Sequence, residues 1–215
     1  NPVKIFKWPA LDQFKNQIQD FIPVARYSDM LLYPGRSFSF NGRTYQYPNI
    51  KLVYWAGGNP FHHQMNLSKL RKATFKPDTV ITNEIWWNSL ARHSDIILPT
   101  TTSLERNDIG FRHWEQTVSP MHKVVDPIGN SKNDYEIFSL ISNKLGFRNE
   151  FTENKNEEEW LKTLWGKAKE SAKENNFYLP DFDEFWNGGF FEVLKPTNEQ
   201  ILMEDFVRNP EQFPL

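Results

Sequence analysis

The spacing of apolar residues predicts a helix near the start of the chain and a hairpin after it. Apolar side chains recur at helical spacing at Leu11, Phe14, Ile18, Phe21 and Ile22. This spacing predicts an amphipathic helix over residues 10–22. Further on, Phe38-Ser39-Phe40 and Arg43-Thr44-Tyr45 flank Asn41-Gly42. Asn-Gly supplies the positive φ angles that a two-residue turn needs, so these segments are predicted to pair as a hairpin.

Strand-like and helix-like segments alternate between residues 51 and 98. The predicted strands and helices, in chain order, cover residues 51–55, 67–75, 79–82, 86–93 and 96–98. The first strand is stopped by Gly57-Gly58 and the last by Pro99. A β-α-β-α-β order implies right-handed crossovers and a parallel sheet.

The second half of the chain is predicted to be mainly helical. A helix over 134–145 is expected to end at Gly146, which suits a left-handed C-cap. Apolar positions between 160 and 172 predict another amphipathic helix, and the charged run 153–159 is expected to be a solvated connector. From residue 177 on, aromatics mixed with Pro and Gly indicate a packed, irregular tail. The chain is therefore predicted to be one α/β domain over residues 1–215. We expect a Rossmann-like, three-layer doubly wound and mostly parallel sheet, with an N-terminal hairpin and a helical C-terminal part.

Composition narrows the class of protein. A chain of 215 residues fits one α/β domain or two small ones, and a net charge of -2 gives no case for nucleic acid as a partner. Without cysteine the chain cannot form disulfides, Fe–S ligands or thiolate zinc sites. No run of about 18–20 apolar residues suggests a membrane span, and no signal peptide is visible. Because Asn1 is an unusual first residue, we expect the chain to be an interior piece of a longer protein.

The candidate chemistry follows the predicted strands, because ligands of open parallel sheets bind beyond the carboxyl ends of the strands. After the first strand, Gly57 and Gly58 would let a ligand approach the backbone, and the amides beyond them form an anion site. The alternative is that the glycines only turn a strand into a helix. After the second strand come Asn83 and Glu84. A carboxylate there commonly accepts hydrogen bonds from ribose hydroxyls, but Glu84 could equally sit in the first turn of a helix.

The third strand end is the hydroxyl-rich segment 100–108, which carries Arg106, a residue suited to phosphate or a base edge. Glu105, Arg106 and Asp108 could instead form a surface ion-pair cluster. Asp134 precedes a helical run, where it could simply satisfy backbone amides. Adjacent histidines such as His62 and His63 rarely converge on one ion, so no metal site is predicted.

Around these strand ends the sequence resembles a known family. Segments including Gly57-Gly58-Asn59-Pro60-Phe61-His62-His63 and Trp86-Trp87 resemble the trimethylamine-N-oxide, dimethyl sulfoxide and biotin sulfoxide reductase branch of the molybdopterin oxidoreductases. The other similar segments are 22–26, 32–35, 53–56, 91–96, 98–99, 101–108, 134–138, 181–183, 185–186, 205–206, 209–210 and 214–215. The resemblance is collinear and covers nearly the whole chain. One departure is Gln64-Met65-Asn66, where relatives usually have His-Gln-Asp.

The resemblance implies a role and a set of contacts. Such enzymes hold molybdenum between two molybdopterin guanine dinucleotides, and the third of their four domains grips one guanosine diphosphate arm. By position, the implied cofactor contacts are Gly57, Gly58, Asn59, His63, Asn83, Glu84, Arg106 and Asp134. Asn59 and the loop amides would hold diphosphate and ribose, Glu84 the ribose hydroxyls and Asp134 the guanine N1–H and N2–H₂ edge. His63 and Arg106 would contact phosphate or base.

The molybdenum ligand and the substrate pocket would lie outside this chain, so we expect no catalytic residue in it and no activity from it alone. The resemblance implies an intact protein that reduces an S-oxide or N-oxide by oxygen-atom transfer. Its partners would be its other domains, its substrate and an electron donor such as a cytochrome. The periplasm is the expected location, with the cytoplasm as the alternative. Two other readings stay open: a stand-alone nucleotide-binding or scaffold domain without redox activity, and a different molybdopterin enzyme such as a dehydrogenase.

Overall fold

The structure is a computed structural model that describes residues 8–11, 18, 21–111, 117–174, 176–192 and 203–213. The helix predicted over residues 10–22 falls largely outside these residues. The chain divides into two compact units, which are described separately. Unit 1 comprises Asn1–Asp12, Asn107–His122 and Lys155–Leu215, and unit 2 comprises Gln13–Arg106 and Lys123–Asn154.

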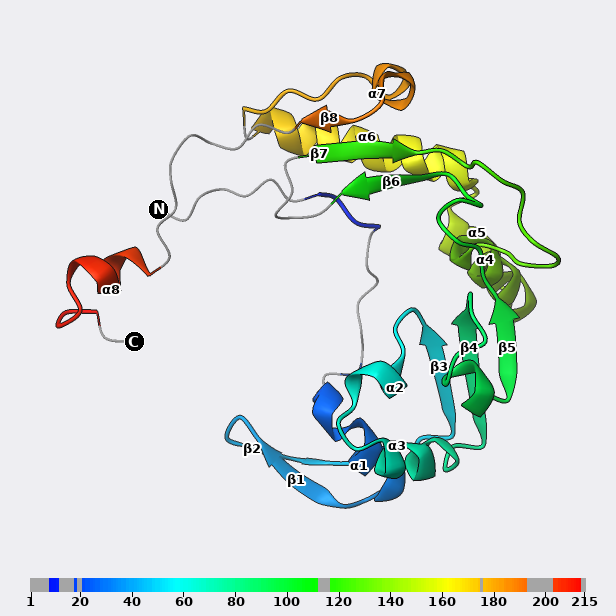
Figure 1. Cartoon of the computed structure of the whole chain (residues 1–215), viewed down its shortest axis with the longest axis vertical. Coiled ribbons are helices and arrows are strands. Elements are labelled where there is room, and N and C mark those ends of the chain that lie inside the picture. The colour runs from blue at the N-terminus through cyan, green and yellow to red at the C-terminus, as the bar shows by residue number, and fades with distance from the viewer. Residues whose placement is uncertain are drawn as a thin grey trace. The chain divides into compact units, whose positions relative to one another are not determined.

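A three-stranded parallel sheet forms the centre of unit 2. Its strands are β3 (Leu52–Ala56), β4 (Thr79–Glu84) and β5 (Ile96–Pro99), in the spatial order β3-β4-β5 (Figure 1). Val80 and Thr82 of the middle strand are almost fully buried, as expected for a strand that has a neighbour on both sides. The parallel sheet predicted from the alternating pattern is therefore confirmed.

Short helices connect and flank these strands. They are η1 (Val24–Arg26), α1 (Tyr27–Leu32), α2 (Pro60–His63), α3 (Leu67–Thr74), η2 (Ala91–His93), α4 (Asp134–Leu145) and α5 (Arg148–Thr152). Asparagine side chains cap three of them: Asn59 accepts the amide of Phe61, Asn66 that of Lys69 and Asn133 that of Glu136. α4 ends at Gly146, whose φ of 86° gives the predicted left-handed cap.

The helix predicted over residues 86–93 is wrong in extent. Only Ala91–His93 is helical, as a single 3-10 turn. The Glu84 carboxylate accepts the amides of Ile85 and Trp86, and the Asn88 side chain accepts the amide of Ala91. These side chains use backbone donors in a turn, which competes with a regular helix.

The predicted hairpin is present and closes with the expected turn. β1 (Ser37–Phe40) pairs antiparallel with β2 (Arg43–Gln46), with Phe40 opposite Arg43. Asn41 and Gly42 both have positive φ, at 47° and 73°. The turn therefore has the geometry for which Asn-Gly is favoured.

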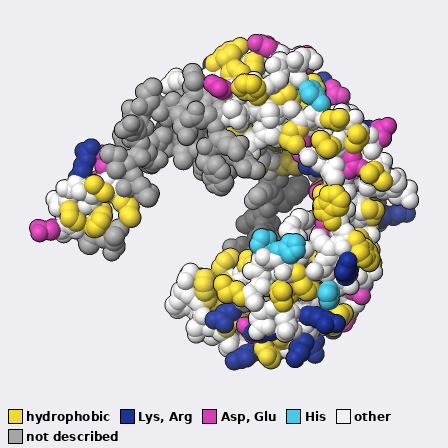
Figure 2. Space-filling model, viewed as in Figure 1, with side chains coloured by type: hydrophobic (Ala, Val, Ile, Leu, Met, Phe, Trp, Pro, Cys, Tyr) yellow, Lys and Arg dark blue, Asp and Glu magenta, His cyan; other side chains and the backbone are white. Residues whose placement is uncertain are grey.

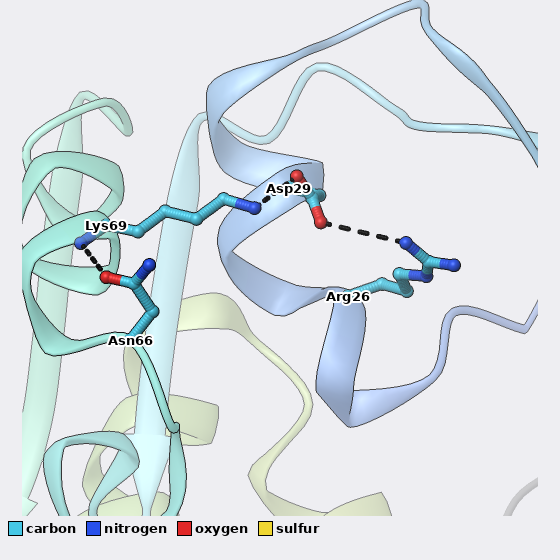
Figure 3. Close-up of polar contacts among 4 residues, drawn as sticks. All are labelled: Arg26, Asp29, Asn66 and Lys69. Atoms are coloured by element: carbon cyan, nitrogen blue, oxygen red, sulfur yellow. Dashed lines mark hydrogen bonds and ion pairs between the residues drawn. The ribbon is translucent and has the colours of Figure 1, made fainter.

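An ion pair joins α1 to α3, with Lys69 Nζ 2.6 Å from Asp29 Oδ1 (Figure 3). Arg26 of η1 lies 3.9 Å from the other oxygen of Asp29 (Figure 3). Lysine and arginine side chains gather over the part of unit 2 where α1 and α3 lie (Figure 2). Arg71 and Lys72 in the last turn of α3 face the negative end of the helix dipole, which their charges complement.

Unit 1 is built on an antiparallel sheet that the sequence did not predict. Its strands are β6 (Asp108–Phe111), β7 (Thr117–Met121) and β8 (Phe191–Glu192), and its helices are α6 (Glu157–Glu174), α7 (Phe182–Gly188) and α8 (Glu204–Arg208). α6 confirms the predicted amphipathic helix but begins inside the charged run that was expected to be a connector. The hydrophobic core of unit 1 includes Val118, Trp165 and Phe185. The rings of Trp165 and Phe185 stack with 3.8 Å between their centroids.

The α/β class, the parallel sheet and the helical C-terminal part are thus confirmed. The three-layer, doubly wound arrangement and the single domain over residues 1–215 stay predictions. Among the described residues, no helix is long and apolar enough to cross a membrane.

Candidate functional site at the carboxyl edge of the parallel sheet

The strand register brings the predicted strand ends to one edge of the sheet. Ala56, which precedes the glycine pair, is opposite Asn83, and Glu84 is opposite Pro99. The amide of Thr100 donates to the Glu84 carbonyl at 3.2 Å, which continues the ladder past β5. All three strands therefore end side by side, as the crevice of an open parallel sheet requires.

The glycine pair turns the chain out of β3 with a backbone that other residues avoid. Gly57 and Gly58 have φ angles of 81° and 77°. A Cβ atom added at either would meet nothing within 4 Å, and both residues are exposed. The positive φ angle favours glycine here, in agreement with the alternative that the pair turns the strand into a helix. The open space beside the two glycines also leaves their backbone accessible to a ligand.

Asn59 follows the glycines and is buried, at 8% exposure. Its Oδ1 accepts the amide of Phe61 at 3.0 Å and caps the one-turn helix α2, which has Pro60 at its first position. The Nδ2 atom of Asn59 is buried and has no hydrogen-bond partner among the described residues. A buried donor without a partner is costly, and a ligand that brings an acceptor would satisfy it.

Glu84 ends β4 rather than beginning a helix, which corrects the structural alternative for this residue. Its Oε1 accepts the amides of Ile85 and Trp86 at 2.9 and 3.3 Å, and its Oε2 accepts the side-chain amide of Asn88 at 2.7 Å. Each carboxylate oxygen has more than one lone pair. Glu84 therefore shapes the turn after β4 and keeps acceptor capacity for a hydroxyl.

Asn83 and Asp134 are in direct contact. Asn83 Nδ2 donates to Asp134 Oδ1 at 2.7 Å, and the Tyr54 hydroxyl donates to Asn83 Oδ1 at 2.8 Å. Asn83 is buried, whereas Asp134 is exposed at the first position of α4. Asn133 caps that helix by accepting the Glu136 amide, and the hydrogen bond from Asn83 places the Asp134 carboxylate at the sheet edge.

Tyr54 was not predicted as a site residue. It lies in β3, and its ring packs against Phe138 of α4 with 5.4 Å between centroids. Burial raises the pKa of Tyr54, and the Asp134 charge adds to the increase. The sequence carried no signal for the contacts of Tyr54 with Asn83 and Phe138, because they depend on how β3, β4 and α4 are placed in space.

Hydrogen bonds fix the loop after β5, residues 100–107, at the same edge. The amide of Thr101 donates to the Lys132 carbonyl at 3.2 Å, and the amide of Lys132 donates to the Pro99 carbonyl at 3.1 Å. Arg106 Nη1 donates to the Thr101 carbonyl at 3.4 Å. The loop that carries Arg106 is thus linked to the segment leading into Asp134, and it adds a positive charge to an edge that carries two carboxylates.

Glu105 has a structural role that the ion-pair interpretation missed. It is 6% exposed, and its Oε2 accepts both the amide and the hydroxyl of Thr102, at 2.7 and 2.8 Å. Its Oε1 accepts the amide of Ile128 at 2.8 Å. These hydrogen bonds, with that from the Thr102 amide the largest, lower the pKa of Glu105. Glu105 therefore fixes the loop by accepting backbone amides.

A second buried polar atom lies in this loop. Thr101 is 3% exposed and its hydroxyl oxygen has no hydrogen-bond partner among the described residues. Together with Asn59 Nδ2, it gives two unsatisfied polar atoms at the ends of β3 and β5. Both atoms are shielded from solvent, so a polar ligand would reach them only with a small shift of the loops.

The histidines lie apart from these contacts. His62 and His63 are exposed residues of α2, and the structure shows no contact that joins His63 to Asn83, Glu84 or Asp134. Within the described part of the chain, no group of three or more His, Asp or Glu side chains could hold a metal ion.

The sequence of this chain matches the model of a family of oxidoreductases. The family model for molybdopterin oxidoreductases matches residues 17–144, which is more than half of the chain. The chain belongs to the molybdopterin oxidoreductase family.

Curated relatives belong to one functional branch. The chain is 46% identical over 198 residues to trimethylamine-N-oxide reductase of Haemophilus influenzae, and 44% identical over 198 residues to dimethyl sulfoxide/trimethylamine N-oxide reductase of Cereibacter sphaeroides. Each match covers 90% of this chain and 24% of the relative. Biotin sulfoxide reductase of Cereibacter sphaeroides is 40% identical over 189 residues, or 87% of this chain and 25% of the relative. The chain thus spans about a quarter of the length of these relatives.

A solved structure supports the fold alone. Acetylene hydratase from Pelobacter acetylenicus matches with a TM-score of 0.54 at 18% identity, over 69% of this chain and 19% of that chain. The family implies a molybdenum–pterin cofactor. The donor and acceptor set at the sheet edge fits the polar arm of such a group, since it offers amide donors, an arginine and carboxylate oxygens that keep lone pairs beyond their hydrogen bonds within the protein.

Proposed function

We propose that unit 2 binds one guanosine diphosphate arm of a bis(molybdopterin guanine dinucleotide) cofactor at the carboxyl edge of its parallel sheet. The observation that carries the proposal is the convergence of the glycine pair, Glu84 and Asp134 on that edge through the strand register and the Asn83–Asp134 hydrogen bond. A Rossmann-like, doubly wound domain is the architecture in which this edge serves nucleotides.

Each group has a role that follows from its chemistry. The exposed backbone at Gly57 and Gly58 and the buried Nδ2 of Asn59 are donors suited to diphosphate oxygens. Because α2 is a single turn, the helix dipole adds little, and the backbone amides are the main donors. Arg106 supplies the positive charge that a diphosphate requires. His63 is assigned to phosphate or base by the resemblance only.

The carboxylates of Glu84 and Asp134 are assigned to different parts of the nucleoside. Glu84 keeps free lone pairs after organising its turn, so it can accept from ribose hydroxyls. Asp134 has an exposed carboxylate that can accept two hydrogens at once. Guanine presents N1–H and N2–H₂ as adjacent donors, whereas adenine has no hydrogen at N1. Asp134 therefore selects guanine over adenine.

The intact protein is proposed to be a molybdenum-dependent reductase of S-oxides or N-oxides. The relatives are named for dimethyl sulfoxide, trimethylamine N-oxide and biotin sulfoxide, and their shared chemistry is an oxide as substrate. The cofactor, when bound, supplies the two-electron redox centre, while the residues of this chain bind and orient it. A cytochrome-type electron donor and a periplasmic location are proposed from the resemblance.

Titration of the 215-residue chain with GDP, with ADP as control, tests the nucleotide assignment. Part of a site should bind near the millimolar range, or about 4 kcal/mol, so ligand-observed NMR is the suitable method. GDP is expected to bind in preference to ADP, and Asp134→Ala should remove the preference. As a matched control, Glu136→Ala changes a carboxylate of the same helix turn that pairs with Lys132, and it should leave the preference intact. Equal binding of GDP and ADP by the folded chain would contradict the assignment.

A further inference from the structure

Three side chains from three elements form one hydrogen-bonded series. The Tyr54 hydroxyl of β3 lies 2.8 Å from Asn83 Oδ1 of β4, and Asn83 Nδ2 lies 2.7 Å from Asp134 Oδ1 of α4. The middle residue is buried, with 5% exposure, while the last is exposed. The series therefore runs from within the fold to a carboxylate that a ligand can reach.

The chemistry of the groups fixes the direction of every hydrogen bond in the series. An ionised carboxylate only accepts, so the NH₂ group of Asn83 must face Asp134. The carbonyl oxygen of Asn83 then faces Tyr54 and needs a donor. Burial raises the pKa of Tyr54, so its hydroxyl keeps the proton that it donates. A flipped Asn83 amide would set its oxygen against the carboxylate, and the Tyr54 hydroxyl would lose the amide oxygen as acceptor of its proton.

We propose that Tyr54 is a positioning residue for base selectivity, acting through Asn83 to hold the Asp134 carboxylate in the orientation that receives guanine N1–H and N2–H₂. This inference rests on the proposed function of the edge. Only one N–H of Asn83 and one lone pair of Asp134 Oδ1 are used within the series. The other carboxylate oxygen and the remaining lone pair of Oδ1 stay available, as a two-point contact with guanine requires.

A substitution of Tyr54 can remove its hydroxyl and keep the packing of its ring. The ring packs against Phe138, whose helix also carries Asp134, so β3 and α4 are held together by ring contacts as well as by the series. Tyr54→Phe keeps the ring and removes only the donor to Asn83. Tyr47→Phe is the matched control, because Tyr47 is a buried tyrosine of unit 2 whose ring stacks on Phe38 of β1.

The test uses the 215-residue chain with GDP, IDP and ADP as ligands, and the Asn83 side-chain amide signals as a second readout. IDP has guanine's N1–H but lacks the N2 amino group. In Tyr54→Phe, GDP affinity is expected to fall about threefold to tenfold, which corresponds to one weakened hydrogen bond to a charged group. ADP affinity should stay unchanged, so the preference for GDP over ADP and over IDP shrinks. The Asn83 amide signals should shift in the ligand-free variant, and Tyr47→Phe should change neither readout.

The outcomes separate this inference from the proposed function. An unchanged preference for GDP in Tyr54→Phe, with wild type selective, overturns the positioning role and leaves the proposed function standing. An equal loss of GDP and ADP affinity also overturns it, since a general structural defect would weaken both. If wild type does not distinguish GDP from ADP, the proposed function fails, and the inference fails with it even where the Asn83 signals respond.

Discussion

Asn83 Nδ2 and Asp134 Oδ1 lie 2.7 Å apart although 51 positions separate the two residues in the chain. The contact joins the end of the middle strand to the first residue of α4. Because Asn83 also accepts the Tyr54 hydroxyl, its side chain uses both its donor and its acceptor ends in the fold. A residue used in this way is expected to contribute to stability as well as to the site.

Replacement of Asn83 by alanine is expected to lower the free energy of unfolding of unit 2 by about 1–2 kcal/mol, because it removes two hydrogen bonds and leaves the Tyr54 hydroxyl without its acceptor. Urea denaturation of the purified variant measures this change. The control is Asn143→Ala, an exposed position of α4 whose substitution should stay within about 0.5 kcal/mol of wild type. Equal stability of Asn83→Ala and wild type would show that the contact does not form in solution.

Glu105 should make stability depend on acid pH. Its pKa is lowered from the ordinary 4.5 by hydrogen bonds from Thr102 and Ile128. A carboxyl group with a lowered folded-state pKa contributes stability that is fully present above its unfolded pKa and is lost as pH falls through the folded value. The stability of wild type should therefore exceed that of Glu105→Gln at neutral pH, and the difference should narrow below about pH 4.5.

Denaturation curves of both proteins at a series of pH values measure this narrowing. Asp78→Asn serves as the control, since Asp78 is an exposed carboxylate that lies 3.5 Å from Lys51 in solvent. Exposed pairs of this kind contribute little, so the control should follow wild type at every pH. A constant difference between Glu105→Gln and wild type across the acid range would argue against the hydrogen-bonded carboxylate.

The sequence predicted the parts of the site that depend on local pattern. The strand ends could be located because Gly57-Gly58 and Pro99 stop apolar runs, and parallel strands end at one edge by topology. The hairpin was predictable because Asn-Gly favours one turn. By contrast, Trp86–His93 has helical spacing, but side chains at 84 and 88 take its backbone amides, and pattern alone does not weigh that competition.

Contacts between distant residues were beyond the sequence. The role of Tyr54 depends on its hydrogen bond with Asn83 of the neighbouring strand. The role of Glu105 depends on the amide of Ile128, which is 23 positions away in the chain. The antiparallel sheet of unit 1 includes β8, a strand of two residues, which is too short for periodicity to show. The assignment of individual site residues to a cofactor stays a prediction.

Of the two ion pairs of Asp29, the one with Lys69, which joins α1 to α3, should contribute more stability than the one with Arg26 of η1. Lys69 and Asp29 are partly buried and 2.6 Å apart, whereas Arg26 is half exposed and 3.9 Å from Asp29. Lys69→Met is expected to cost about 1 kcal/mol, and Arg26→Met about 0–0.3 kcal/mol, because long exposed pairs contribute little. The measurement is urea denaturation at low and high salt. The cost of Lys69→Met should shrink only modestly in salt, since partly buried pairs are weakly screened. Equal costs for the two variants would contradict this ranking.

The glycine pair should be intolerant of side chains because of its backbone angles. Gly58 has a φ of 77°, and an added Cβ would meet no atom within 4 Å, so any cost of Gly58→Ala comes from the backbone conformation rather than from a clash. The left-handed region costs an L-residue about 1–2 kcal/mol, and asparagine tolerates it better than alanine does. Gly58→Ala is thus expected to lower the free energy of unfolding of unit 2 by about 1 kcal/mol or more, and Gly58→Asn by less. Thermal or urea denaturation of both variants measures which of the two loses more free energy of unfolding.

Gly166 provides the opposite case in the same chain. It lies within α6, has no positive φ, and a Cβ there would also meet nothing within 4 Å. Alanine in a helix interior is favoured over glycine by about 0.5–1 kcal/mol, so Gly166→Ala should stabilise unit 1. Since neither substitution meets a steric obstacle, opposite signs at positions 58 and 166 would show that backbone conformation alone decides the outcome. Stabilisation by alanine at both positions would mean that the turn after β3 is not held in the left-handed region in solution, and destabilisation at both would contradict the expectation for Gly166.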